Sequence, residues 1–129
     1  MLQKESYIKT TDNTDSTISK CIGLTNKKKA GIGDVITVSI KKTRADKTKT
    51  VLKTKIKKKQ IHKLLIINTK KKYQRIDGDS IEFLENTGVL ITIEKSTFIP
   101  LGTRILSAIP YELKKKKFLK ICALSTNFV

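Results

Sequence analysis

The stretch Asp34–Ile40, which reads DVITVSI, decides the fold class. Ile36, Val38 and Ile40 alternate with the polar residues Thr37, Ser39 and Lys41. An apolar residue at every second position is typical of a β-strand with one buried face. The sequence therefore predicts a strand here.

Further strands are expected along most of the chain. They lie at Ile18–Ile22, Val51–Ile56, Leu64–Asn68, Ile81–Leu84, Val89–Ile93 and Phe118–Leu124. Leu64–Asn68 (LLIIN) is a short, continuous apolar run, which predicts a strand buried on both faces. We expect Ile81–Leu84 and Val89–Ile93 to form a hairpin through residues 85–88, and Asp77-Gly78 to form a tight turn.

Helix signals are confined to Pro110–Lys117 (PYELKKKK). Pro110 suits the first helical position, Glu112 the positive end of the helix dipole, and the lysines its negative end. Several short strands with almost no helix indicate a mainly β barrel or sandwich, in one domain spanning residues 1–129. A barrel is favoured because it leaves no exposed edge strands.

Charge predicts the class of partner. The chain of 129 residues has 28 basic and 11 acidic residues, for a net charge of +17. Such an excess favours a polyanion, because each neutralised phosphate releases condensed counterions. We therefore predict nucleic acid. A membrane surface would call for a basic amphipathic helix with apolar anchors, which the sequence does not show, and the run Leu64–Ile67 is too short to span a bilayer.

The basic residues are concentrated in one part of the chain. From residue 41 to residue 75 there are fifteen basic residues and one acid, whereas residues 76–94 contain five acids and no base. We expect the lysine runs to form loops that contact RNA; a disordered tail is disfavoured because the runs alternate with strands. Tyr73 is the candidate for base stacking. The predicted RNA-binding residues are Lys27, Lys28, Lys29, Lys41, Lys42, Arg44, Lys47, Lys49, Lys53, Lys55, Lys57, Lys58, Lys59, Lys70, Lys71, Lys72, Tyr73 and Arg75.

Groups suited to catalysis are scarce. His62 is the single histidine and lies in a basic segment that we expect to be a surface loop, while Cys21 and Cys122 lie in apolar contexts typical of the core. Residues 77–85 lack the spacing of a calcium loop. Gly31–Asp34 (GIGD) precedes a strand rather than a helix, so we interpret it as a turn and not as a phosphate-binding loop. The sequence predicts no enzyme activity, metal, cofactor or small-molecule substrate.

Several stretches, taken in order, resemble the universal L-fourteen family of large-subunit ribosomal proteins. The resemblance is carried by Asp12-Asn13, Cys21-Ile22, Ala30–Ile36 (AGIGDVI), Asn68–Lys72 (NTKKK), Arg75–Gly78 (RIDG), Ile81–Phe83 (IEF), Pro100–Ile105 (PLGTRI), Tyr111–Leu113 and Lys117–Ile121. It implies a five-stranded β-barrel with a short helical C-terminal part. It also implies a structural role near the subunit interface, with binding to large-subunit rRNA and bridges to small-subunit rRNA.

The resemblance also implies protein partners. These are the third and nineteenth large-subunit ribosomal proteins and a ribosome-silencing factor that docks on the C-terminal region. The positions that correspond to protein or bridge contacts are Thr103, Arg104, Lys114, Lys117 and Lys120. A free RNA-binding barrel, such as an assembly factor, would share the charge but would not account for the ordered motifs.

The chain departs from the family pattern in three places. The family's Asp-Asn-Ser-Gly-Ala reads Asp12–Ser16 (DNTDS) here, the loop before Ala30 is shortened to Lys27–Lys29, and Asn68 stands in place of an arginine. Lysine outnumbers arginine by 25 to 3, which fits an AT-rich genome. These features predict a mitochondrion-encoded ribosomal protein; an AT-rich bacterium or a plastid is the alternative.

Overall fold

The computed structural model describes residues 1–25, 28–44, 56–116 and 118–129. Within these ranges the chain forms strands and two short helices. In chain order they are β1 Tyr7–Thr10, β2 Ser16–Leu24, β3 Val35–Thr43, β4 Ile61–Asn68, β5 Tyr73–Gln74, β6 Ser80–Ile81, β7 Thr87–Glu94, β8 Thr97–Pro100, α1 Glu112–Lys115 and α2 Leu119–Cys122.

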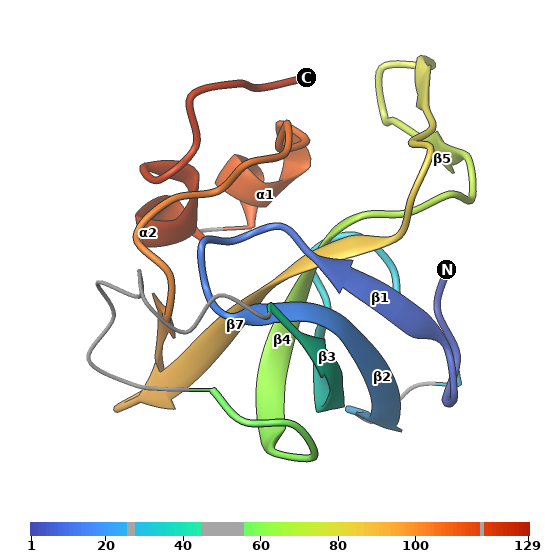
Figure 1. Ribbon diagram of the computed structural model, residues 1–129. Helices are drawn as coiled ribbons and strands as arrows, with labels where there is room; N and C mark the ends of the chain where they lie inside the picture. The colour runs from blue at the N-terminus through green and yellow to red at the C-terminus, as the bar shows by residue number, and fades with distance from the viewer. Residues whose placement is uncertain (26–27, 45–55, 117) are drawn as a thin grey trace.

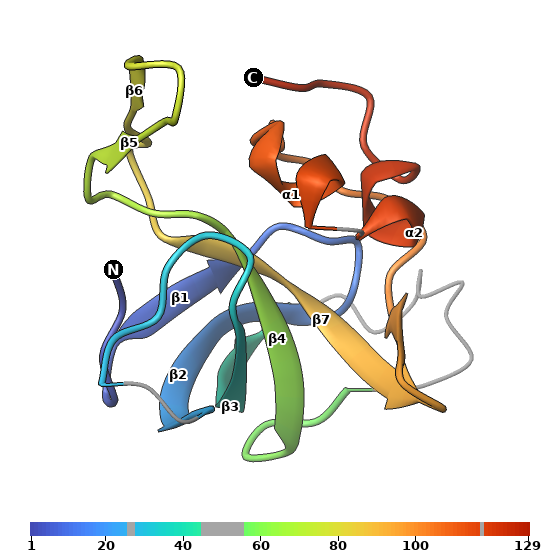
Figure 2. The ribbon, with the colours of Figure 1, turned by 180° about the vertical axis from the view of Figure 1, so that it is seen from behind.

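Five of the strands close into a barrel (Figures 1 and 2). Strands β1, β2, β3, β4 and β7 are antiparallel neighbours in that order, and β8 extends the sheet beyond β7. The barrel closes where β1 pairs with β7 in parallel, with Lys9 opposite Thr87 and Thr10 opposite Gly88. This topology confirms the mainly β fold and the five-stranded barrel that the resemblance implied.

The barrel interior is aliphatic. Ile36, Val38 and Ile40 of β3 are fully buried there, as their alternation predicted. They pack with Leu64 and Ile66 of β4 in one cluster, which also includes side chains from the first two strands. Burial of this kind stabilises the barrel by about 1.5–3 kcal/mol for each large aliphatic side chain.

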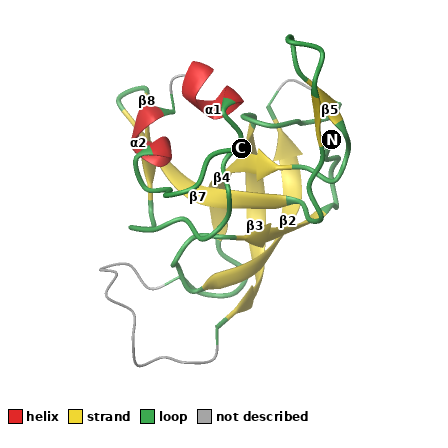
Figure 3. Cartoon of the chain, turned by 90° about the horizontal axis from the view of Figure 1, so that it is seen from above, coloured by secondary structure: helices red, strands yellow, loops and turns green. Residues whose placement is uncertain are grey.

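Strand β4 is buried on both faces, which confirms that prediction. Leu64 and Ile66 face the interior, whereas Leu65 and Ile67 belong to a second hydrophobic cluster outside the barrel. That cluster also holds Leu113 and other residues of the C-terminal segment. The helices α1 and α2 therefore cover part of the outer surface of the barrel (Figure 3).

Gly88 allows the barrel to close tightly. It lies opposite both Thr10 of β1 and Ile66 of β4. A β-carbon at this position would lie 2.3 Å from Cδ2 of Leu64 and 2.7 Å from the carbonyl oxygen of Leu65. A side chain larger than hydrogen would therefore push β4 and β7 apart.

The predicted hairpin between Ile81–Leu84 and Val89–Ile93 is wrong. Strand β6 pairs with β5, and β7 pairs with β4, β1 and β8. The apolar run at 81–84 has no common buried face, because Leu84 is 92% exposed. The turn at Asp77-Gly78 is confirmed: Gly78 has a φ of +91°, and the Arg75 N–H donates to the Asp79 carbonyl oxygen at 2.7 Å.

The strand predicted at Phe118–Leu124 is also wrong, because α2 forms there. Phe118, Ile121 and Cys122 are buried, and their spacing of three and four residues is the helical period. The predictions at Ile18–Ile22 and Pro110–Lys117 are confirmed by β2 and by the shorter α1. The strand expected at Val51–Ile56 falls on residues that lie outside the described ranges, apart from the buried Ile56. Strands β1, β5 and β8 were not predicted.

Candidate nucleic-acid interface

Most of the predicted RNA-binding residues that can be placed are exposed. Those lying outside the described ranges are Lys27, Lys47, Lys49, Lys53 and Lys55, together with the predicted contact Lys117. The exposed ones are Lys28, Lys29, Lys41, Lys42, Arg44, Lys57, Lys58, Lys59, Lys70, Lys71, Lys72 and Tyr73. Arg75 is half-buried.

Several lysines expected in loops lie on regular elements instead. Lys41 and Lys42 lie near the end of strand β3, and Lys63 lies in β4. The loop prediction was wrong at these positions because a strand can continue past the edge of the core, where both of its faces meet solvent. Lys41 and Lys42 show this directly, since β3 has consecutive exposed residues there.

Most of the exposed residues among the predicted RNA contacts fall into two groups, at opposite ends of the β3–β4 ladder. One group comprises Lys41, Lys42, Arg44 and Lys57–Lys59, near the turn that leads into β4. The other lies beyond the opposite end of β4, at Lys70–Lys72 and Lys29. Figures 1 and 2 show the β5–β6 hairpin and the helices above that second end of the barrel, and the turn before β4 at the first.

Lys29, Lys71 and Lys72 of the second group line a cavity of about 340 Å³, which we call the basic cavity. Its wall includes Lys29 from the loop before β3, Lys71, Lys72 and Tyr73 from the segment after β4, and Lys116 from the end of α1. Three segments that are distant in the sequence therefore bring four lysines together. Sequence reasoning selected Lys29, Lys71 and Lys72 but did not predict that they share one site.

Lys116 was not among the predicted contacts, and Gly33 explains how it reaches the cavity. The Lys116 Nζ donates a hydrogen bond of 2.7 Å to the Ile32 carbonyl oxygen. Gly33 has a φ of +80°, and a β-carbon there would lie 2.6 Å from Cδ of Lys116. The second glycine of the GIGD segment thus leaves room for the lysine stem. This glycine was the one signal in the sequence for the arrangement.

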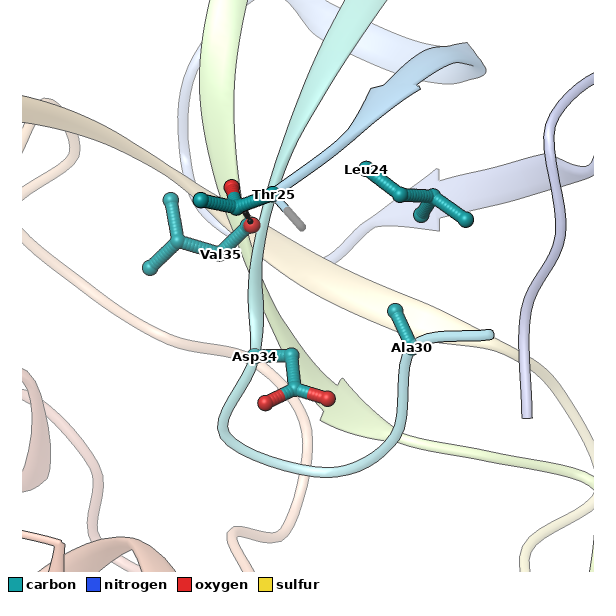
Figure 4. A pocket seen from close by; sticks show the side chains of 5 residues that line it. All are labelled: Leu24, Thr25, Ala30, Asp34 and Val35. Atoms are coloured by element: carbon teal, nitrogen blue, oxygen red, sulfur yellow. Dashed lines mark hydrogen bonds between the residues drawn. The ribbon is translucent and has the colours of Figure 1, made fainter. Parts of the chain in front are cut away.

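The local charge is strongly positive, although one carboxylate lines the cavity. The Asp34 Oδ2 accepts a hydrogen bond of 2.8 Å from the Gly31 N–H. Its carboxylate lies within the turn of its own loop (Figure 4), beside a second, smaller pocket that Leu24, Ala30 and Val35 help to line. Burial lowers the pKa of the Met1 amino group, and the charges of Lys71 and Lys29 lower it further.

Arg75 is held by protein groups. Its Nε lies 2.5 Å from Oε1 of Glu112, and its Nη2 donates to the Val129 carbonyl oxygen at 2.7 Å. The two side chains are 23% and 15% exposed. Arg75 therefore tethers the β5–β6 hairpin to α1 and to the C-terminal segment.

The Asp-Asn and PLGTRI motifs contact each other. The Asn13 Oδ1 accepts the N–H groups of Thr103 and Arg104 at 2.8 and 3.2 Å, and its Nδ2 donates to the Thr103 hydroxyl at 2.7 Å. Gly102 permits this approach, since a β-carbon there would lie 2.7 Å from the Asn13 Oδ1. The side chains of Thr103 and Arg104 are left exposed on a loop whose backbone is fixed.

Asp12 has a structural role inside the molecule. Its Oδ2 accepts the Leu90 N–H of β7 at 3.1 Å, and its Oδ1 accepts the N–H and hydroxyl of Thr14. Burial raises the pKa of its carboxyl, against these hydrogen bonds. Asp15, where the family has glycine, is absent from the described residues with a positive φ, so this loop does not depend on that glycine.

The histidine and the two cysteines do not form a catalytic or metal-binding cluster with other described residues. His62 lies in β4 rather than in the expected loop, and burial lowers the pKa of its imidazole. Cys21 and Cys122 are buried and unpaired, which confirms them as core residues. Within the described ranges, no three histidine, cysteine or acidic side chains are grouped to bind a metal. No helix in those ranges is long and apolar enough to cross a membrane.

The whole chain is similar to a known family of proteins. The model of the family described as ribosomal protein L14p/L23e matches residues 1–129. The chain belongs to this family. The large ribosomal subunit protein uL14 of Carsonella ruddii (strain PV) is 36% identical over 132 residues, and the match covers 100% of each chain. As a member of the L14p/L23e family, the protein is a structural constituent of the ribosome.

Proposed function

We propose that this L14p/L23e protein is a component of the large ribosomal subunit. In this role its exposed lysines bind large-subunit rRNA near the subunit interface, and it helps to form bridges with small-subunit rRNA. The observation that carries the proposal is the family match over the whole chain, together with the large-subunit protein that is similar over its full length. We also propose that residues 1–129 form one domain, since β4 contributes to both hydrophobic clusters.

The distribution of charge supports binding to folded RNA. The two groups of basic side chains lie at opposite ends of the β3–β4 ladder, so they can contact phosphates on different RNA segments. Most of these lysines are exposed and are therefore available to phosphate. Contacts of this type position a protein on RNA by shape and charge rather than by base sequence.

Protein and bridge contacts are proposed at the C-terminal side of the molecule. Thr103 and Arg104 are exposed on the loop that Asn13 holds, Lys114 is exposed on α1 and Lys120 on α2. Lys117 belongs to the same proposed set. The partners would be the third and nineteenth large-subunit ribosomal proteins, and a ribosome-silencing factor.

The location proposed is the mitochondrial ribosome. The support is compositional: 25 lysines against 3 arginines fit an AT-rich organellar genome. The alternative is an AT-rich bacterium or a plastid, and a bacterial relative with 36% identity is consistent with that alternative.

Sedimentation of native ribosomes tests the proposed function. The protein should travel with the large subunit at one copy per particle, and should stay there when monovalent salt is raised enough to remove loosely bound factors. A protein found only in the soluble fraction would contradict the proposal. A minor, salt-sensitive association would instead indicate a free assembly factor.

A further inference from the structure

We propose that the basic cavity holds a single phosphate group, and that this phosphate belongs to the RNA backbone. The inference rests on the proposed function for the identity of the RNA. It goes further by making four lysines, namely Lys29, Lys71, Lys72 and Lys116, ligands of one phosphate rather than of four.

The chemistry of the wall selects a phosphate. Four lysines and the N-terminal residue Met1 line the cavity together with one acidic residue, Asp34, whose carboxylate accepts the Gly31 N–H. A lysine acts on phosphate as a compact point charge with three donors, so several lysines can surround one tetrahedral anion. Tyr73 adds a hydroxyl group to the same wall.

The size of the cavity fits the same ligand. At about 340 Å³ the cavity is many times larger than the space that a single bound water needs. This is enough for a phosphate with part of its sugar and a few retained waters. The four lysines of its wall are exposed, so an RNA backbone can approach the cavity from solvent.

One ligand is positioned before RNA arrives. The Lys116 stem lies against Gly33, and its Nζ is held at the Ile32 carbonyl oxygen. Less rotamer freedom is therefore lost when this lysine meets an anion. We therefore expect Lys116 to contribute more to binding than the cavity lysines that have no such support. Lys116 is a binding residue that the basic runs alone did not single out.

Counterion release distinguishes one shared phosphate from four separate ones. A plot of log binding constant against log salt concentration has a negative slope. The magnitude of this slope decreases by about 0.9 for each phosphate that is no longer neutralised. If four lysines share one phosphate, replacing all four by methionine lowers the slope by about one. Four independent contacts would lower it by about four.

The first experiment measures binding of the full chain to large-subunit rRNA over a range of salt concentrations. It compares the wild type with a variant that carries Lys→Met at positions 29, 71, 72 and 116. A charge-matched control carries Lys→Met at positions 41, 57, 58 and 59, all exposed at the other end of the β3–β4 ladder. A slope reduced by about one in the cavity variant supports the proposal. An unchanged slope, or a reduction near four, overturns it.

Pairs of substitutions provide a second readout. Lys116→Met should weaken binding several-fold, and Lys116→Arg should recover most of the loss because it restores the charge. In a Lys72→Met background the added effect of Lys116→Met should differ from its effect in the wild type, since both lysines contact one group. Strict additivity of the two losses would count against a shared phosphate.

Inorganic phosphate separates the ligand chemistry from its source. In a phosphate titration followed by NMR of the lysine amino groups, the signals of the four cavity lysines should shift with one common midpoint. That midpoint should lie at a lower phosphate concentration than the midpoints of Lys57–Lys59. Addition of rRNA should displace the phosphate if the RNA backbone is the natural source. Equal shifts at all exposed lysines would show that the cavity is not a specific phosphate site. Phosphate that stays bound in the presence of RNA would show that the natural ligand is not a phosphate of the RNA backbone.

The two proposals fail in different ways. If wild-type protein binds large-subunit rRNA and the cavity variant keeps the full slope, this inference alone is wrong. If the wild type does not bind that RNA, the proposed function and the RNA assignment are wrong, and the phosphate titration alone decides whether the cavity binds an anion.

Discussion

Replacing Arg75 by methionine should destabilise the protein without reducing the salt dependence of RNA binding. Arg75 lies in the basic part of the chain and was predicted to contact RNA, but its guanidinium group is bound by Glu112 and by the Val129 carbonyl oxygen. The substitution keeps an apolar stem and removes the guanidinium group, with its positive charge and its hydrogen-bond donors. It therefore separates a tether from a phosphate ligand.

The contacts set the size of the effect. Two polar partners lie at 2.5 and 2.7 Å, and the paired side chains are 23% and 15% exposed. A hydrogen bond to a charged group contributes about 1.5–3 kcal/mol, and partial solvent screening reduces this for the pair. We expect the free energy of unfolding to fall by about 1–3 kcal/mol. For a chain of this length that corresponds to a melting temperature lower by roughly 3–10 °C.

Urea denaturation and rRNA binding provide the two readouts. Glu112→Gln should cost a similar amount, and the double variant should cost less than the sum of the two, because the pair is lost only once. Lys70→Met is the matched control: its side chain is exposed, so its stability should change by less than about 0.5 kcal/mol while its salt slope falls. Arg75→Met with native stability and a slope reduced by about one would refute the tether.

Four further predictions concern the fold and the exposed loop. Gly88→Ala should cost about 1–3 kcal/mol in urea denaturation through overpacking, whereas Gly31→Ala, with no atom within 4 Å of the new methyl group, should cost much less. Asn13→Ala should lower the free energy of unfolding by about 1–3 kcal/mol and speed hydrogen exchange at the amides of residues 103 and 104, since it loses three hydrogen bonds. Burial raises the pKa of the Asp12 carboxyl, so the folded protein binds the carboxyl proton more tightly than the unfolded chain does. The contribution of Asp12 to stability should therefore fall as the pH rises from 3.8 through the raised pKa. An NMR titration of this carboxyl with a midpoint at or below pH 3.8 would contradict the prediction. Arg104→Lys should weaken rRNA binding only slightly if the residue makes a positional contact, and a loss of tenfold or more would indicate a bidentate one.

The strands that the sequence predicted well are those whose pattern depends on local burial. The alternation at Ile36, Val38 and Ile40 and the continuous run at Leu64–Ile67 state directly which faces are buried. Pairing is different, because it depends on which strands meet in space. Ile81–Leu84 was assigned to β7 as its nearest neighbour in the sequence, whereas β7 pairs with strands on both sides of the barrel. The edge strand β8 was not predicted because it is short and ends in Pro100.

For the candidate site, too, some features were predictable from the sequence and others were not. Exposure of the lysines followed from their charge, since a lysine is seldom buried without a partner. Their convergence did not, because no periodicity connects Lys29, Lys71 and Lys116, and only the closed barrel brings their segments together. Arg75 is the converse case: it belongs to a basic run, but the fold supplies Glu112, 37 residues away in the sequence, as its partner.

The parallel pairing of β1 with β7 has a consequence for synthesis on the ribosome. Lys9 cannot meet Thr87 until β7 has been made, which at about 5–20 residues per second takes roughly 4–15 seconds after β1 appears. During that interval the nascent chain presents its lysine-rich middle segment and its unpaired Ile-rich strands at once. Closure of the barrel is thus a late event in translation, and a folding delay caused by a change at Gly88 would prolong exposure of the strands most prone to aggregate.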